Sequence, residues 1–220
     1  MTATVGVAVF PGTNCELDSI HAVESLGGTG KILWHSSKNL SEVDAVIIPG
    51  GFAHGDYLRP GAIARFSPLM SAITDFANNG GPVLGICNGF QVLTESGLLP
   101  GALQKNKGLK FLCKTVEVRV ETENSTLTRN AAKGVKLSLP INHFEGNFTC
   151  DHDTLNSLLE QDRVVLRYCD NPNGSIDDIA GVCNESRNVV GIMPHPERAC
   201  DSLLGSEDGK VLFDSLLGAN

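Results

Sequence analysis

The sequence predicts an α/β fold with a mostly parallel central sheet, helices on both faces and a small antiparallel excursion. In the first half of the chain, short apolar runs rich in β-branched residues alternate with helical patterns. Those runs are apolar on both faces, as expected for strands of a parallel sheet that is covered on two sides. In the second half, Val116, Val118 and Val120 alternate with charged residues, which indicates a half-exposed strand.

The expected elements follow the order of the chain. A first strand over 5–10 ends at Pro11-Gly12, and Thr13 or Asn14 can then cap a helix that runs to about Leu26. No linker or repeat interrupts residues 1–220, which we expect to form one domain. The other expected elements are strands over 31–35, 44–48, 82–86, 116–120, 135–141, 164–168, 179–183 and 189–193, and helices over about 68–78, 154–160 and 210–217.

The composition is that of a globular chain. Of the 220 residues, 41% are hydrophobic and 24 are glycine, which is enough to bury a sizeable core. The 17 basic and 25 acidic residues give a formal net charge of −8, and no basic cluster reverses it locally. Phosphate backbones and anionic lipids repel such a chain, so we expect neither nucleic acid nor a membrane surface as a partner.

The sequence also indicates a cell compartment. No apolar run approaches the roughly 18 residues of a spanning helix. No basic residue precedes Lys31, so the start lacks the charged region of a secretory signal. The 7 cysteines are odd in number and form no Cys-x-x-Cys pair, which argues against a disulfide framework and a zinc finger. We therefore expect a cytoplasmic protein with reduced thiols.

One segment predicts a nucleophilic thiol. Cys87 lies between Gly85 and Gly89, directly after an apolar strand and before a helix. Small residues two before and two after permit the strained strand-to-helix turn of a nucleophile elbow. The turn presents the sulfur at the carboxyl edge of the sheet, where a helix N-terminus favours the thiolate. The other cysteines lack such a context and are expected to be structural: Cys15, Cys113, Cys150, Cys169, Cys183 and Cys200.

A thiol nucleophile needs a base and a group that orients the base. His195 lies in the segment 193–197, immediately after an apolar strand, between two prolines. The prolines are expected to keep the segment extended, so that Glu197 lies on the same side as His195 and can reach its imidazole. Alone, this segment would be a rigid surface turn with a solvated pair. Together with Cys87 it indicates catalysis.

Acyl chemistry also needs donors for the oxyanion, commonly backbone N–H groups. The N–H of Asn88, which follows the nucleophile, is one candidate. Gly50-Gly51 ends the preceding parallel strand and can bring a second N–H close, because no side chain obstructs it.

These motifs together resemble the triad-type (class I) glutamine amidotransferases. The segments that carry the resemblance are 85–91 and 194–197. Within that class the chain is similar in particular to the glutaminase subunits of phosphoribosylformylglycinamidine synthase, a family of purine biosynthesis. This closer similarity rests on the segments 10–16, 50–52 and 55–62 and extends over nearly the whole chain.

The resemblance implies an activity. Such subunits hydrolyse L-glutamine to glutamate and ammonia, and a synthetase subunit uses the ammonia to make formylglycinamidine ribonucleotide from formylglycinamide ribonucleotide and ATP. The implied roles are Cys87 as nucleophile, His195 as base, Glu197 as its orienting carboxylate, Gly51 and Asn88 as oxyanion donors, and Gln91 in the glutamine pocket.

The same resemblance implies partners, namely a large synthetase subunit together with a small third subunit in many versions. This chain has no Gly-x-x-x-x-Gly-Lys-Ser/Thr phosphate loop. We therefore expect no cofactor in this chain, and ATP and Mg²⁺ on the synthetase subunit. No metal site is expected either, because Asp177-Asp178 has no companion ligands at a fitting spacing.

Two positions depart from the family pattern. The family often has His-Gly-Glu-Gly where this chain has His143-Phe144-Glu145-Gly146, and often Ser-Tyr where this chain has Ala53-His54. The departures affect the rim of the pocket and the contact with a partner rather than the triad. His143 and His54 are accordingly expected to be structural or interfacial.

Two other functions stay open at this point. One is a cysteine hydrolase of the same fold without ammonia transfer, although peptidase relatives commonly carry His after the nucleophile, where this chain has Asn88. The other is a catalytically silent regulatory protein, for which a glutamine-analogue electrophile would fail to label Cys87.

Overall fold

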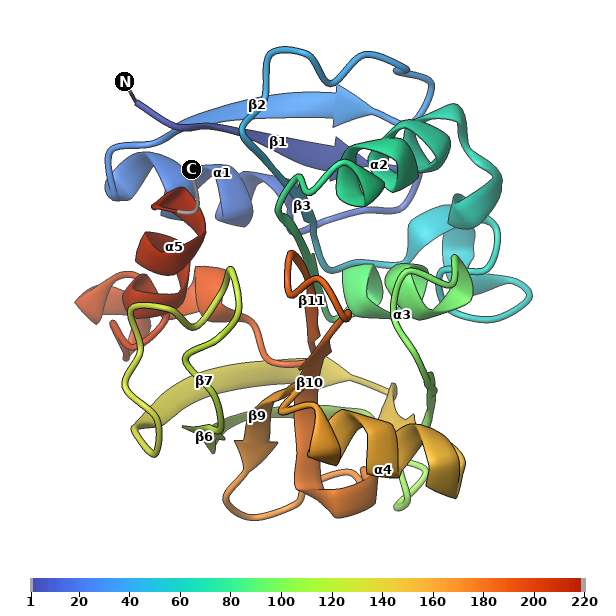
Figure 1. Cartoon of the computed structure of the whole chain (residues 1–220), viewed down its shortest axis with the longest axis vertical. Coiled ribbons are helices and arrows are strands. Elements are labelled where there is room, and N and C mark those ends of the chain that lie inside the picture. Colours follow the sequence, from blue (N-terminus) through green and yellow to red (C-terminus); the bar gives the residue numbers. More distant parts are fainter. Residues whose placement is uncertain (1, 219–220) are drawn as a thin grey trace.

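A computed structural model describes residues 2–218 (Figure 1). A nine-stranded sheet runs through the molecule in the order β2-β1-β3-β4-β11-β10-β9-β6-β7, beside a two-stranded sheet of β5 and β8. The strands are β1 (Thr4–Val9), β2 (Thr29–Trp34), β3 (Ala45–Ile48), β4 (Val83–Ile86), β5 (Ala102–Lys105), β6 (Leu112–Val120), β7 (Lys136–His143), β8 (Glu145–Thr149), β9 (Val164–Tyr168), β10 (Ile179–Cys183) and β11 (Val189–Ile192).

The sheet has a parallel part and an antiparallel part. The strands from β2 to β11 pair in parallel, and those from β11 to β7 pair antiparallel. Helices α1 (Glu16–Ser25) and α5 (Lys210–Leu217) lie on one face of the parallel part, and α2 (Pro68–Asn78) and α3 (Asn88–Glu95) lie on the other (Figure 1). Helix α4 (His152–Glu160) lies beside the antiparallel part. The predicted α/β fold class is confirmed.

The central strands form because their residues can be buried on both faces. Every residue of β3, β4 and β11 is buried, as the continuous apolar runs predict. Helix α2 begins where predicted: Pro68 occupies its first turn and the Ser67 hydroxyl accepts a hydrogen bond from the Met70 N–H at 3.2 Å. No helix among residues 2–218 combines the length and the hydropathy that crossing a bilayer requires.

The register of the parallel strands creates the site. Ile48 of β3 pairs with Gly85 of β4, and Ile86 of β4 pairs with Ile192 of β11. The loops that follow these strands therefore leave the sheet at one edge. In open α/β sheets ligands bind outside the carboxyl ends of the strands, which is where Gly50-Gly51, Cys87 and His195 come.

The predicted start of the first helix is wrong. Helix α1 begins at Glu16 with Cys15 at its N-cap, and no side chain caps it. The Thr13 hydroxyl instead accepts from the Phe10 N–H at 3.0 Å, and the Asn14 N–H donates to the Gly50 carbonyl at 3.4 Å. Residues 13–14 thus contact Gly50-Gly51 at the end of β3 instead of capping helix α1. Strands β5 and β8 lie outside the predicted elements.

Candidate active site

Cys87 occupies a strained turn between β4 and α3. Its φ of 50° and ψ of −103° place a non-glycine residue in the left-handed half of conformational space, a cost of about 1–3 kcal/mol that is typical of functional sites. Its N–H donates to the Ile192 carbonyl at 2.8 Å, which anchors the turn to β11. A Cβ on Gly89 would lie 1.8 Å from the Ile48 carbonyl oxygen, and one on Gly85 would lie 2.7 Å from the Gly89 oxygen. The two glycines are thus required by close backbone approach.

His195 and Glu197 form a buried pair behind the turn. The His195 Nδ1 and a Glu197 carboxylate oxygen are 2.6 Å apart, and the residues are 1% and 2% exposed. The expected extended segment is wrong, because Pro196–Arg198 forms a 3₁₀ turn. Proline is compatible with the first position of such a turn, since it lacks only an N–H that has no partner there. The predicted contact between the two side chains is nevertheless present.

The surroundings of His195 favour its charged form. Burial alone would lower the pKa of His195, but the Glu197 carboxylate and the nearby Cys87 and Cys15 sulfurs outweigh burial and raise that pKa well above its ordinary value. The His195 Nε2 is buried and has no hydrogen-bond partner within residues 2–218. An imidazolium whose Nδ1–H is fixed on a carboxylate keeps its other N–H available for a reacting group.

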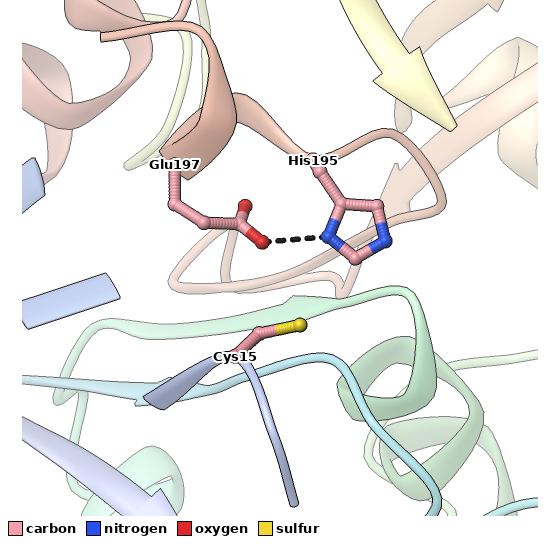
Figure 2. A group of neighbouring side chains, drawn as sticks. All are labelled: Cys15, His195 and Glu197. Atoms are coloured by element: carbon pink, nitrogen blue, oxygen red, sulfur yellow. Dashed lines mark hydrogen bonds and ion pairs between the residues drawn. The ribbon is translucent and has the colours of Figure 1, made fainter. Parts of the chain in front are cut away.

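A second thiol, that of Cys15, lies next to this pair. Cys15 was expected to be only structural, which does not explain why it lies beside His195. Figure 2 shows the Cys15 sulfur directed toward the His195 ring, and the donor atoms of Cys15, His195 and Glu197 lie within 4.8 Å of one another. The Arg198 guanidinium donates to this sulfur at 3.2 Å and is itself held by Asp18 at 3.1 Å. Each member of the cluster therefore has a partner within the chain: Arg198 for the Cys15 sulfur, and the short His195–Glu197 bond for the other two.

The predicted residues converge on one cavity. It has a volume of about 860 Å³ and opens at the carboxyl ends of the parallel strands. Gly51, Cys87, Gln91 and His195 line it, whereas Glu197 lies behind His195. Asp56 and Cys15 also line the cavity, and this was not predicted from the sequence. Asp56 follows strand β3, which lies beside β4, and Cys15 follows strand β1, which lies beside β3. Their positions after the carboxyl ends of these strands could have indicated it.

Two backbone N–H groups at the cavity are free to bind an anion. Within residues 2–218 neither the Gly51 nor the Asn88 N–H has a hydrogen-bond acceptor in range. Gly51 has a φ of 145°, and a Cβ there would lie 2.8 Å from the Thr13 Cα, so only glycine fits between the strand end and the loop before α1. The Asn88 N–H also points from the first position of α3, where the helix dipole favours negative charge.

The Asn88 side chain joins the two walls of the cavity. Its amide oxygen accepts from the Ala53 N–H at 3.0 Å, and its Nδ2 contacts Gln91 Oε1 at 2.9 Å and Asp56 Oδ1 at 3.3 Å. Gln91 also donates to the Glu145 carbonyl. The helix that follows the nucleophile thus holds the loop that follows Gly51 and the turn between β7 and β8.

His143 and His54, which lie in the two segments that differ from the family pattern, have different surroundings. His143 lines the cavity, is 3% exposed and contacts Asn106 Oδ1 through Nδ1 at 3.0 Å. His54 packs edge-on against His35, with ring centroids 5.9 Å apart, and does not line the cavity. Neither contacts the His195–Glu197 pair through a hydrogen bond.

His143 gives a testable pH dependence of stability. Burial first, and the charge of His195 second, lower the pKa of His143 from 6.5 to about 4. The unfolded chain therefore takes up this proton at a higher pH than the folded chain, so the stability contribution is complete above pH 6.5 and is lost as the pH falls toward 4. We expect His143→Gln to reduce the loss of unfolding free energy between pH 7 and pH 4 by about 3 kcal/mol. Urea unfolding of wild type and His143→Gln at both pH values measures this free energy. Equal losses in the two proteins would contradict the lowered pKa of His143.

Comparison with known proteins defines the class. A model of the CobB/CobQ-like glutamine amidotransferase domain matches residues 2–209. A protein from Thermoplasma acidophilum described as part of a putative GMP synthase shares the fold, with a TM-score of 0.69 and 17% identity over 100% of this chain and 94% of that one. The domain match over nearly the whole chain places it among the glutamine amidotransferases.

More similar relatives narrow the class. Phosphoribosylformylglycinamidine synthase subunit PurQ from Rubrobacter xylanophilus is 59% identical over 97% of both chains, and that from Koribacter versatilis is 55% identical over 97% of both. A chain in the structure of PurLQS from Thermotoga maritima has a TM-score of 0.91 and 44% identity, over 99% of this chain and 98% of that chain. The chain belongs to the family of PurQ subunits of phosphoribosylformylglycinamidine synthase. The resemblance inferred from its motifs is confirmed.

Proposed function

We propose that this chain is the glutaminase subunit of a phosphoribosylformylglycinamidine synthase and that Cys87, His195 and Glu197 are its catalytic triad. The observation that carries the proposal is the meeting of a strained Cys87 and a buried His195–Glu197 pair, 2.6 Å apart, at one strand-end cavity. The class and the PurQ family agree with this chemistry.

Each side chain has a defined step. The Cys87 sulfur, as thiolate, attacks the side-chain amide carbon of glutamine, and the oxygen takes up negative charge. The Gly51 and Asn88 N–H groups donate to that oxyanion. His195, held by Glu197, gives its proton to the nitrogen as the C–N bond breaks, so that ammonia leaves and a γ-glutamyl thioester remains.

The second half of the reaction returns the site to its starting state. Neutral His195 takes a proton from water while that water attacks the thioester. Glutamate leaves, and the Cys87 thiolate and the His195 imidazolium are restored. Gln91, whose side chain is fixed between Asn88 and Glu145, forms part of the glutamine pocket.

The ammonia then passes to a synthetase subunit. The chain in the PurLQS structure belongs to an assembly with other subunits. We infer that this chain likewise has a large synthetase partner and a small third subunit, and that ATP and Mg²⁺ bind the partner while this chain needs no cofactor. We further infer one amidotransferase domain and a cytoplasmic location, which suits seven cysteines without a disulfide.

Glutamate release tests this function. We expect the chain, combined with its synthetase subunits, formylglycinamide ribonucleotide and ATP, to release glutamate from glutamine and to make formylglycinamidine ribonucleotide in equal amounts. Release without matching synthesis would support a hydrolase that does not transfer ammonia. No release in the assembled complex would support a silent regulatory subunit.

A further inference from the structure

The cavity contains a carboxylate that the mechanism above does not use. Asp56 lies in the loop after β3, at the end of the 3₁₀ segment Ala53–Asp56, and lines the cavity together with Cys87 and Gln91. Three successive residues of this loop, His54, Gly55 and Asp56, have φ values of 54°, 73° and 54°. Non-glycine residues in this region cost about 1–3 kcal/mol each, so the loop holds Asp56 toward the cavity against local preference.

Asp56 has no cation. Within residues 2–218 no Lys, Arg or His nitrogen lies within 4.0 Å of its carboxylate. The nearby Arg59 is paired with Glu95 at 2.8 Å. Glu145, a further carboxylate residue of the cavity wall, also forms no ion pair within residues 2–218, although Lys105 is its register partner in the β5–β8 ladder. Asp56 differs from Glu145 in its side-chain contact with Asn88, the residue that follows Cys87.

The existing contacts of Asp56 compensate its burial only in part. Its Oδ1 accepts from the Asn88 Nδ2 at 3.3 Å, a long hydrogen bond. Burial raises the pKa of Asp56, and hydrogen bonds from Gly61 and Asn88 offset this only partly. A cationic group of a ligand in the cavity would supply the positive charge that the Asp56 carboxylate lacks. A half-buried carboxylate is stabilised by a direct ammonium partner.

We propose that Asp56 binds the α-ammonium group of the substrate and so makes the site specific for an α-amino acid amide. The proposal rests on the proposed function, since it assigns the far end of the glutamine molecule. Asn88 follows the nucleophile and contacts Asp56 directly, and the amide carbon and α-nitrogen of extended glutamine are roughly 5 Å apart. Lys105 and Lys107 line the same cavity, so it offers both signs of charge to a zwitterion.

The test compares two substrates that differ only at the α-carbon. Glutaramate is glutamine with hydrogen in place of the α-amino group, and its amide is otherwise the same. We expect the assembled wild-type complex to prefer glutamine in kcat/KM by about 100-fold or more. Asp56→Asn should reduce that preference to below about 10-fold, mainly through a raised KM for glutamine, with little change for glutaramate.

Two variants separate charge from loop structure. Asp56→Glu keeps the carboxylate in the same loop and should keep most of the preference even if it lowers the melting temperature. Asp75→Asn removes an exposed carboxylate of helix α2 that does not line the cavity and should leave the preference at its wild-type value. A substitution that only disturbs the loop would slow both substrates equally and leave their ratio unchanged.

The possible failures are distinguishable. If wild type hydrolyses glutamine but does not discriminate against glutaramate, or if Asp56→Asn keeps the full preference, the assignment of Asp56 is wrong while the proposed function stands. If the assembled wild-type complex hydrolyses neither substrate, the proposed function itself fails.

Discussion

Replacing Cys87 with Ala should lower glutamine-dependent synthesis by the assembled complex by about 10⁴-fold or more. The substitution removes the only atom that bonds to the substrate in the proposed mechanism, and loss of a nucleophile has an effect of this order in comparable enzymes. Synthesis from added ammonium should stay within about 2-fold of wild type, since ammonium bypasses the glutaminase site. Product formation with each nitrogen source measures both rates.

A matched variant controls for the loss of a buried thiol. Cys183 is fully buried in β10, its pKa is raised by burial to about 11, and it does not line the cavity. Cys183→Ala should keep glutamine-dependent synthesis near its wild-type value. Loss of ammonium-dependent synthesis in a folded Cys87→Ala complex would contradict the division of labour between the subunits.

Replacing Glu197 with Gln should lower kcat for glutamine hydrolysis by about 10²–10⁴-fold. The carboxamide can still contact His195 Nδ1, but it removes the negative charge and can stabilise the wrong tautomer, as in related triads. Burial lowers the pKa of His195 and the Glu197 carboxylate raises it, so without that charge the pKa of His195 falls. The activity that needs the imidazolium should then be confined to lower pH.

A pH profile of kcat/KM measures this displacement. The limb on which the imidazolium loses its proton should move to lower pH in Glu197→Gln. Glu207→Gln, which removes an exposed carboxylate paired with Lys210, serves as the control and should keep the wild-type profile. A Glu197→Gln enzyme with the wild-type rate and profile would show that Glu197 does not orient or charge His195.

The parts of the site that could be predicted are those that local sequence determines. Gly85, Cys87 and Gly89 encode the elbow through sterics alone, and the short separation of His195 and Glu197 allows their contact in more than one backbone conformation. The contact is therefore present although its predicted basis, an extended segment with both side chains on one side, is wrong and the segment is a 3₁₀ turn.

The parts that could not be predicted depend on distant pairing. Cys15 comes close to His195 because strand β1 pairs with strand β3. Asp56 lies at the cavity because the residues of its loop have positive φ values, which the hydrophobic periodicity of the sequence does not indicate. Thr13 and Asn14 are good capping residues by local preference, yet neither caps the helix. The Thr13 hydroxyl accepts from the Phe10 N–H, and the Asn14 N–H donates to the Gly50 carbonyl. Strand β5 was missed for a similar reason, since its partner β8 follows it by about forty residues and no residue of β5 is fully buried.

The position of the covalent intermediate shows directly which thiol is the nucleophile. Two buried thiols, Cys87 and Cys15, lie near His195 and line the cavity. Acid quenching of the working complex during glutamine turnover, followed by peptide mass spectrometry, should find one glutamyl group on Cys87. A glutamyl group on Cys15, or none on Cys87 while glutamate is being released, would contradict the assignment of the nucleophile.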